Sequence, residues 1–374
     1  MNSSLLKWLE RNINKVLLLS LIAIVLFPWL LSLPAFCSFF DITGGGSVGD
    51  AIGGITAPII GIVSISLLVL TLKAQKEADY HSQLENRIFQ LIRLHKDNVV
   101  AMHSISSEAD LNGQEVFKLI SKQIASCVSE IRPFINRAQE SELLSDHFAP
   151  VFDELKLNVE KKQFVLLDIA FSIVYIGTGK DSMDQLKSIL CQRYNSDLIN
   201  TIIAIERLKP ALSAEKTRAQ WNKWNRISDE RKVKLLPLFE LPYEEMSDDD
   251  SALIRASYDL LHKGSYKKYY WGHQFRLSHY YRHLFMVIEY ITNIEGLSPE
   301  QKYEYVKILR AQLSTTEQIL LMANSISQLG GEWELFRKDE IKYITTYNLI
   351  KNIPQSTVFG VEYRKIYPKV KYQI

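Results

Sequence analysis

The hydrophobic and polar positions divide the chain into an apolar N-terminal part and a longer amphipathic remainder. No charged residue occurs at positions 16–40 or 51–72, which gives uncharged runs of 25 and 22 residues. A helix rises about 1.5 Å per residue, so each run can cross the roughly 30 Å hydrocarbon layer of a bilayer. The pattern predicts two membrane-spanning helices, about 16–37 and 50–72, that form a transmembrane hairpin within residues 1–75.

Glycine is concentrated in the stretch GGGSVGDAIGGITAPIIG at 44–61. A phosphate-binding loop would end in Gly-Lys-Ser/Thr and a dinucleotide fingerprint would follow a strand, and neither condition is met. Small residues instead recur at every fourth position, which on a helix makes a face where another backbone can approach closely. These membrane-packing candidates are Gly45, Gly49, Gly53, Ala57 and Gly61. We expect a turn at 44–46 and a homo-oligomer assembled through the transmembrane and stalk helices.

The charges that flank the two runs predict their orientation. Basic residues precede the first run and follow the second, whereas the connection between the runs carries only Asp41 and Asp50. The positive-inside rule therefore predicts a multi-pass membrane protein with both termini in the cytoplasm. The sequence Ala35-Phe36-Cys37 is a poor cleavage site for a signal peptide, so we expect a retained anchor; a lipoprotein-like Cys37 is the alternative.

Helical periodicity continues beyond the second run. A stripe of buried-type positions at spacings of three and four comprises Leu84, Ile88, Leu91, His95, Val99 and Met102. It predicts an amphipathic stalk helix over 76–105, in which His95 is a core residue without a site role. Further helices are predicted over 114–138, 141–162 and 164–176, the last apolar but containing Asp168. The fold class is all-α, with a cytoplasmic helical domain over 106–374.

Composition adds few constraints. The net charge of the 374 residues is +2, which gives no global signal for a polyanion partner. The three cysteines show no pairing or metal-binding pattern, and this suits a reducing compartment. The segment at about 180–268 has the weakest pattern. Its Trp221 and Trp224, among basic residues, favour a solvated amphipathic helix over a patch that binds nucleic acid or lipid.

Two C-terminal helices carry the clearest signals. One is predicted over 274–293, and a second begins at the capping box Ser298-Pro299-Glu300-Gln301 and ends at Gly330-Gly331. Polar residues on this second helix recur at steps of four and three, so they predict a polar stripe on one face. We expect a polar network comprising Arg282, His283, Arg310, Gln312, Ser314, Glu317 and Asn324. A solvated face with weak ion pairs is the open alternative.

These segments resemble a known family. The run LSHYYRHLF at 277–285, the motif LRAQLS at 309–314, and Glu317 with Asn324 are similar to the putative phage abortive infection proteins, the AbiC-like family. The segment GDAIGG at 49–54 and the stalk agree with the same pattern. The resemblance covers 40–105 and 272–355 and implies a bacterial antiphage effector that halts or kills the infected cell. We expect its cytoplasmic domain to sense infection and to trigger membrane perturbation or growth arrest.

The expected partners are the lipid bilayer and a phage-derived or host trigger protein, with no cofactor. His273, His279 and His283 lack the third ligand and the general base of a catalytic zinc site, so no metal is expected. Whether the protein is an enzyme stays open. The alternative function is a membrane-tethered ribonuclease of the all-helical HEPN-like kind, with RNA as its substrate. Its catalytic candidates are Arg276, Arg282 and His283, because an arginine can hold a phosphate while a histidine moves a proton.

Overall fold

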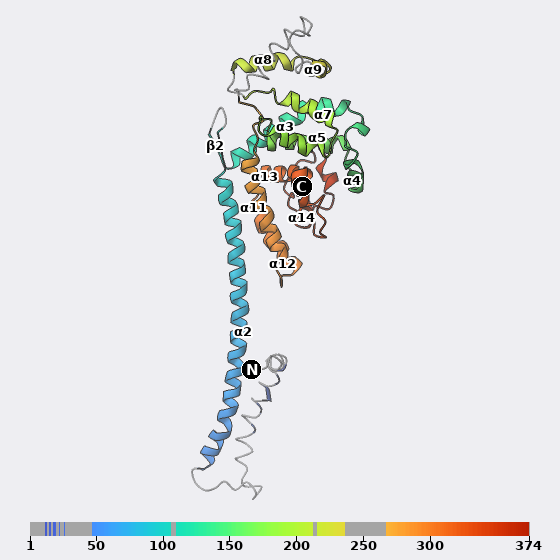
Figure 1. Cartoon of the computed structure of the whole chain (residues 1–374). Coiled ribbons are helices and arrows are strands. Elements are labelled where there is room, and N and C mark those ends of the chain that lie inside the picture. The colour runs from blue at the N-terminus through green and yellow to red at the C-terminus, as the bar shows by residue number, and fades with distance from the viewer. Residues whose placement is uncertain are drawn as a thin grey trace. The chain divides into compact units, whose positions relative to one another are not determined.

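The computed structural model describes residues 47–105, 110–211, 215–235 and 267–373, together with single positions between Asn12 and Leu26. It is 69% helix and 3% strand (Figure 1), which confirms the predicted all-α class. The chain divides into two compact units, residues 1–87 and 88–374. Each unit is described by itself below.

The described part of the first unit is the beginning of helix α2, Ser47–Val100. Its stretch Thr56–Val100 is long and apolar enough to cross a membrane, and only 6% of its most apolar window is buried. A core helix of a soluble protein would be mostly buried. Among the described atoms, none lies within 4 Å of a Cβ built on Gly53 or Gly61. Gly45 and, apart from a few single positions, the first predicted span at 16–37 lie outside the described residues.

The second unit begins with the last turns of α2. Its buried positions there are Ile88, Ile92, His95 and Val99, which follow the predicted stripe except that Ile92 replaces Leu91. The helix is followed by a small antiparallel hairpin, β1 (His103–Ile105) and β2 (Asp110–Asn112), in which His103 pairs with Asn112. The predicted stalk helix over 76–105 is therefore too long at its end: α2 ends at Val100, and residues 103–105 form β1.

The core of this unit is built around one buried helix, α5 (Lys161–Ile176), as predicted. It packs against α3 (Gln114–Arg137), α6 (Met183–Cys191), α11 (Gln274–Asn293) and α13 (Thr315–Ile326). The single helix predicted over 141–162 is wrong. That stretch holds η2 (Glu140–Glu142) and α4 (Phe148–Glu154), because the chain between them pairs with another loop: the Ser145 amide donates to the Arg193 carbonyl oxygen.

The weakly patterned middle also contains helices. After α6 come α7 (Ser196–Glu206), α8 (Glu215–Asn225) and α9 (Asp229–Leu235). The Asn195 side chain caps α7 by accepting from two backbone amides. Trp221 and Trp224 of α8 are both buried, which is the arrangement expected of an amphipathic helix. Residues 236–266, including the acidic run at 248–250, lie outside the described residues.

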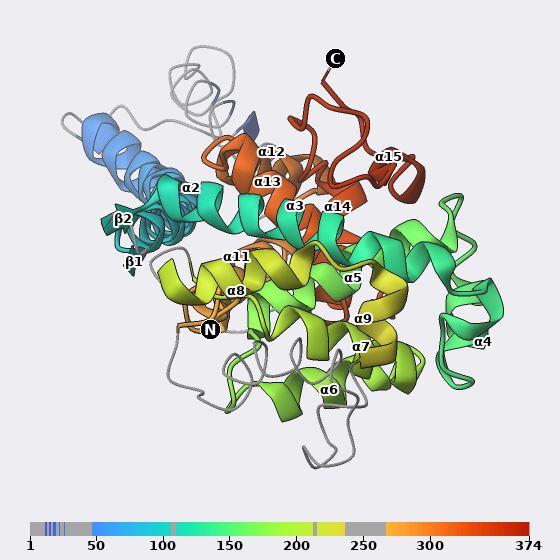
Figure 2. The same cartoon turned by 90° about the horizontal axis from the view of Figure 1, so that it is seen from above.

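The C-terminal part contains α11 at the predicted position and then two helices where the sequence analysis expected one. They are α12 (Pro299–Arg310) and α13, followed by η5 (Gln328–Trp333), α14 (Tyr343–Thr346) and α15 (Tyr363–Ile366). The expectation of one helix to Gly330 is wrong because Ser314 and Glu317 form a second capping box that starts α13. Seen from above, α3 crosses the domain between α12–α15 and α5–α7 (Figure 2).

Two glycines join the end of α5 to the start of α11. Gly177 and Gly272 both have positive φ, at 94° and 89°. A Cβ on Gly272 would lie 2.3 Å from the Ile176 carbonyl oxygen, and one on Gly177 would lie 2.7 Å from the Gly272 nitrogen. Any other residue would push the two backbones apart, so glycine is required on both sides of this contact. The contact fixes where α11 begins.

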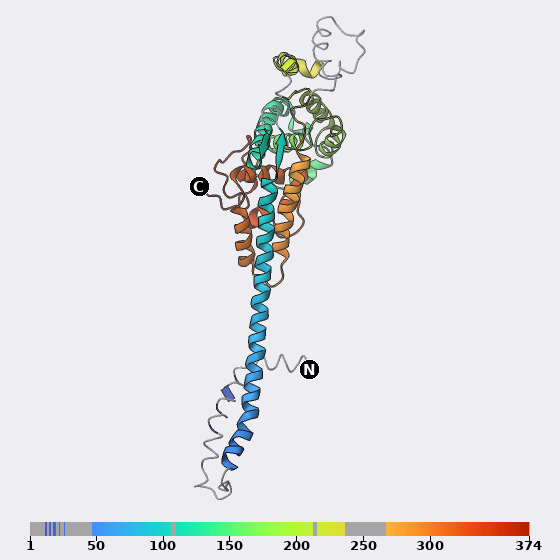
Figure 3. The same cartoon turned by 90° about the vertical axis from the view of Figure 1, so that its left-hand side faces the viewer.

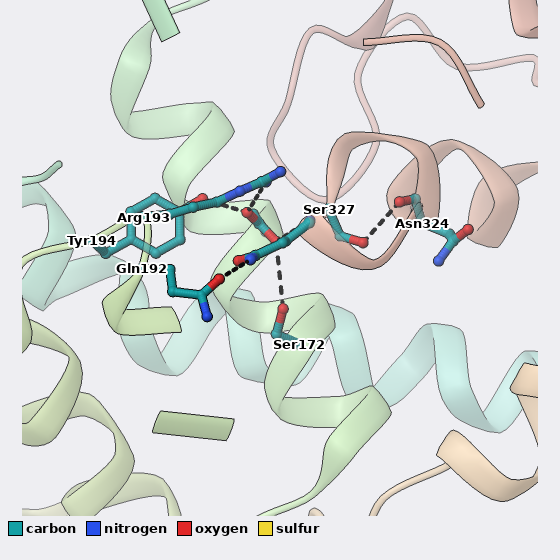
Figure 4. Close-up of polar contacts among 8 residues, drawn as sticks. Ser172, Gln192, Arg193, Tyr194, Asn324 and Ser327 are labelled. Atoms are coloured by element: carbon teal, nitrogen blue, oxygen red, sulfur yellow. Dashed lines mark hydrogen bonds and ion pairs between the residues drawn. The ribbon is translucent and has the colours of Figure 1, made fainter. Parts of the chain in front are cut away.

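The buried carboxylate of Asp168 connects three segments of the core. Arg193 donates to its Oδ2 at 2.8 Å and Tyr194 at 2.5 Å, while the backbone amide of Gln328 donates to Oδ1 at 3.2 Å (Figure 4). The Arg193 guanidinium also lies against the rings of Phe148 and Phe336, at 4.8 and 4.4 Å from their centroids. Asp168 is therefore a structural residue that ties α5 to the α6–α7 connection and to η5.

We expect Asp168→Asn to destabilise the fold strongly. It would leave the Arg193 charge buried without a countercharge, at a cost of about 3–5 kcal/mol in unfolding free energy. Thermal and urea unfolding of the detergent-purified full chain would measure the loss. The matched control is Glu304→Gln in the exposed Glu304–Lys307 pair, where a change within about 0.5 kcal/mol is expected. Equal stability of Asp168→Asn and the unmodified protein would contradict this role.

Candidate functional site

One face of α11 carries three of the polar residues that the sequence singles out. Arg276, Tyr280 and His283 are separated by four and three residues, so they lie on the same side of the helix over about 10 Å of its length. This face meets the last turns of α2 and the start of β1 (Figure 3). We call this contact the α2–α11 seam.

Two histidines stack across the seam. The rings of His95 and His283 are inclined by 16° with their centroids 5.8 Å apart, and His95 also lies 5.0 Å from the Tyr280 ring. None of the four imidazole nitrogens has a hydrogen-bond partner among the described residues, although all are buried. Burial, and then the neighbouring charge of His283, lower the pKa of His95 to about 4. Burial also lowers the pKa of His283, so both rings are neutral near pH 7.

The far side of Tyr280 is anchored by a buried carboxylate. The Tyr280 hydroxyl donates to Oε1 of Glu317 at 3.1 Å, and Gln114 donates to Oε2 at 2.7 Å. Ser314 also donates to Oε2 at 2.7 Å, from its hydroxyl. Burial and then the charge of Glu317 raise the pKa of Tyr280 well above its usual value, so the phenol remains protonated. Hydrogen bonds among polar side chains of α3, α11 and α13 thus fix the position of Tyr280 on the buried side of the seam.

Arg276 occupies the other end of the seam. Its Nε donates to the His103 carbonyl oxygen at 2.6 Å, and its guanidinium lies 4.9 Å from the centroid of the Trp271 ring. Burial lowers its pKa, but an arginine remains charged at neutral pH. A cleft of about 410 Å³ opens beside it; its lining residues are Asn98, Ala101, Met102, His103, Phe275, Arg276, His279 and Tyr280.

The predicted polar network is dispersed over separate positions. Arg282 is exposed on another side of α11, and Gln312 is exposed in the α12–α13 connection. Arg310 is buried on α12, where it donates to the Tyr347 carbonyl oxygen at 2.8 Å. Asn324 accepts from the Trp333 indole at 2.9 Å near the far end of α13. The capping box that splits the predicted helix explains this dispersal, and Ser314 and Glu317 alone of the set share hydrogen bonds.

The three histidines considered as metal ligands also separate. His273 is buried and bonded to Gln123 at 2.6 Å, whereas His279 is exposed and His283 stacks on His95. In the part of the chain that the structure describes, no group of three or more potential ligands lies together. Each of these three histidines therefore lies in different surroundings, and they do not converge on one point.

Sequence reasoning missed the partners that complete the seam. His95 was expected in the core, and it is buried, but its contact with His283 could not be read from a helical stripe. Gln114 opens α3 and carries no motif. Tyr280 stood within the family-like run without a role assigned to it. Only the capping-box spacing of Ser314 and Glu317 offered a local signal for the polar group behind the seam.

A second buried cluster lies outside the seam. Tyr270 donates to Oε2 of Glu130 at 2.7 Å, and Lys209 pairs with the same carboxylate. The neighbouring Glu206 is fully buried; burial and then the charge of Glu130 raise its pKa well above the usual value. Glu206 and Tyr270 are each only 1% exposed, whereas the Glu130 side chain is 24% exposed, so the cluster lies at the edge of the core and stabilises the packing of α3 against α7.

Comparison with known proteins supports the family resemblance. Residues 272–358 match the family model described as "Putative phage abortive infection protein" (putAbiC). The matched segment begins at Gly272 of the glycine contact and includes α11, α12 and α13. No curated protein and no solved structure matches the chain. The family match therefore covers His283, Arg276 and Glu317, while their partners His95 and Gln114 precede it.

The lowered pKa of His95 predicts that acid weakens the fold. The unfolded chain binds a proton at His95 near pH 6.5 and the folded chain only near pH 4, so stability falls as pH decreases through this window. We expect His95→Phe to reduce this slope by about 1.4 kcal/mol per pH unit. Unfolding of the purified full chain at pH 7, 6, 5 and 4 would measure it, with exposed His279→Phe as control. An unchanged slope in His95→Phe would contradict the prediction.

Proposed function

We propose that this protein is a membrane-anchored effector of bacterial abortive infection, resident in the inner membrane with its helical domain in the cytoplasm. The observation that carries the proposal is the continuity of α2. This one helix includes the uncharged run 51–72 and also contributes His95 to the seam with the family-matched segment. An apolar helix with so little burial suits a lipid environment.

The seam is the part of the domain best suited to act as a switch. Leaving a buried polar atom without a hydrogen bond costs about 1–3 kcal/mol, and the His95–His283 pair has four such nitrogens. The Asp168 and Glu317 carboxylates, in contrast, are fully supplied with donors. We propose that a phage-derived or host trigger opens the α2–α11 seam and that α2 passes this change to the membrane segment, which perturbs the bilayer.

Assembly of several copies through the membrane segment would complete the effector. Gly53 and Gly61 have open space around them in the described part of the chain. On a helix they lie on one face with Ala57, which lets a second backbone approach closely. We propose that this face forms a homo-oligomer, whose membrane segments perturb the bilayer together.

The ribonuclease alternative draws on one observation. Arg276 and His283 lie on the same face of α11, as an arginine and a histidine that act on one phosphate would. Both nitrogens of His283 are nevertheless closed off by His95 and its surroundings. A nuclease would therefore also require the seam to open. The two functions differ in whether the membrane or the RNA of the infected cell is damaged first.

We expect His95→Phe to lower phage protection at least tenfold in plating assays while the protein remains abundant. Phenylalanine keeps the ring contact but removes two unsatisfied nitrogens, so the seam becomes harder to open. His283→Phe should behave alike, and His147→Phe, at an exposed histidine outside the seam, is the matched control. Loss of membrane potential should precede RNA damage in infected cells. Full protection by His95→Phe would contradict the role of the seam as a switch. Cleaved RNA behind a polarised membrane in cells that carry the unmodified protein would support the ribonuclease.

We expect Gly53→Leu to weaken oligomers by about 1–2 kcal/mol per helix contact, because leucine would separate closely packed backbones. Crosslinking in membranes should show fewer oligomers, and protection should fall while membrane insertion is unchanged. Leu68→Ile, an exposed substitution elsewhere on the same apolar helix, is the control. Unchanged crosslinking and protection in Gly53→Leu and Gly61→Leu would contradict the packing role.

A further inference from the structure

A cluster of basic and aromatic residues precedes and opens α11, and the proposed function does not use it. The Lys267 ammonium and the Arg276 guanidinium each lie 4.9 Å from the centroid of the Trp271 ring. One indole therefore holds two cations by cation–π attraction. No acidic side chain pairs with either cation in the part of the chain that the structure describes. Two positive charges therefore share one aromatic ring, without an acidic partner among the described residues.

Further positive charge lies on the same segment. Backbone bonds from Ala211 to the Lys267 carbonyl oxygen and from Tyr269 to the Lys209 carbonyl oxygen join residues 209–211 to 267–269. This pairing brings Lys268 near Arg207. Burial and then the charge of Arg207 lower the pKa of Lys268 to about 8. Lys268 and Arg207 therefore add positive charge to the segment that leads into α11.

An exposed aromatic ridge stands beside these cations. The Phe275 side chain is 85% exposed, and the His279 ring one turn later lies 6.5 Å from it. The two residues separate two clefts: one of about 460 Å³ on the side of Trp271 and Ser182, and the 410 Å³ cleft on the side of His103. Neither cleft is lined by an acidic residue. Each is large enough for a group of nucleotide size.

We propose that this surface binds single-stranded nucleic acid, with bases stacked on Phe275 and His279 and phosphates held by Lys267 and Arg276. Exposed aromatic rings beside cations are the combination that such ligands require, because every base offers a face for stacking and every linkage a negative charge. A duplex hides its base faces. A symmetric contact between two copies of this surface would place cations against cations. The proposal goes beyond the effector function and can be tested without infection.

The test is fluorescence anisotropy of a labelled 12-nucleotide oligouridine with the full chain in detergent. Phe275→Ala should weaken binding about tenfold through lost stacking. Lys267→Gln should weaken it and reduce the salt dependence of log K by about 0.7, as expected for one lost phosphate contact. Phe89→Ala, an exposed phenylalanine on α2, and Lys118→Gln, an exposed lysine on α3, are the matched controls. Melting temperatures would verify that every variant is folded.

Binding that the two site variants weaken and the two controls leave unchanged would support the proposal. Absence of binding, or equal binding by all variants, would overturn it. Equal affinity for a 12-base-pair duplex would overturn the stacking role of Phe275. Displacement of the strand by ATP at lower concentration than by unlabelled oligouridine would overturn the assignment to a strand. A change in mass by light scattering on Phe275→Ala would instead identify the ridge as a contact between copies.

Discussion

The buried carboxylate of Asp168 sets the constraint on which the second unit, residues 88–374, depends. A carboxylate with no exposure, in the middle of the most buried helix, is tolerated only if donors surround it. Those donors come from the α6–α7 connection and from the start of η5, so the network fixes both against α5. Because η5 directly follows α13, it also fixes one end of that helix. The other end of α13 carries Glu317, which anchors Tyr280 in the seam.

The contrast between satisfied and unsatisfied polar groups separates the rigid part of this domain from the part able to change. Asp168 and Glu317 each receive several hydrogen bonds, whereas the stacked rings of His95 and His283 receive none within the described residues. Neutral imidazoles are held there by packing alone. Such a contact is less favourable than a hydrogen-bonded one, because its buried polar atoms are unsatisfied. It lies in the last turns of α2. This contact without hydrogen bonds among the described residues lies on the same helix that contains the uncharged run 51–72.

The start of α11 serves both the seam and the basic surface. The Gly177–Gly272 contact sets the helix in place, and from there Arg276 and His283 face α2 while Phe275 projects into solvent. A ligand on Phe275 and Arg276 would also contact the cleft that Tyr280 and His103 line. The proposed ligand surface and the seam therefore share Arg276 and Tyr280. The segment matched by the family model contains this whole face of α11.

The sequence by itself determined the features that depend on residues close together along the chain. Periodicity placed α11 at 274–293, and the absence of charge identified 51–72 as an apolar helix; the family resemblance rested on short motifs. The tertiary structure decided the rest. It paired His95 with His283, gave Asp168 its partners and separated Arg310 from Glu317. These contacts join residues far apart in the chain, and a helical stripe states which face is buried but not which residue will cover it.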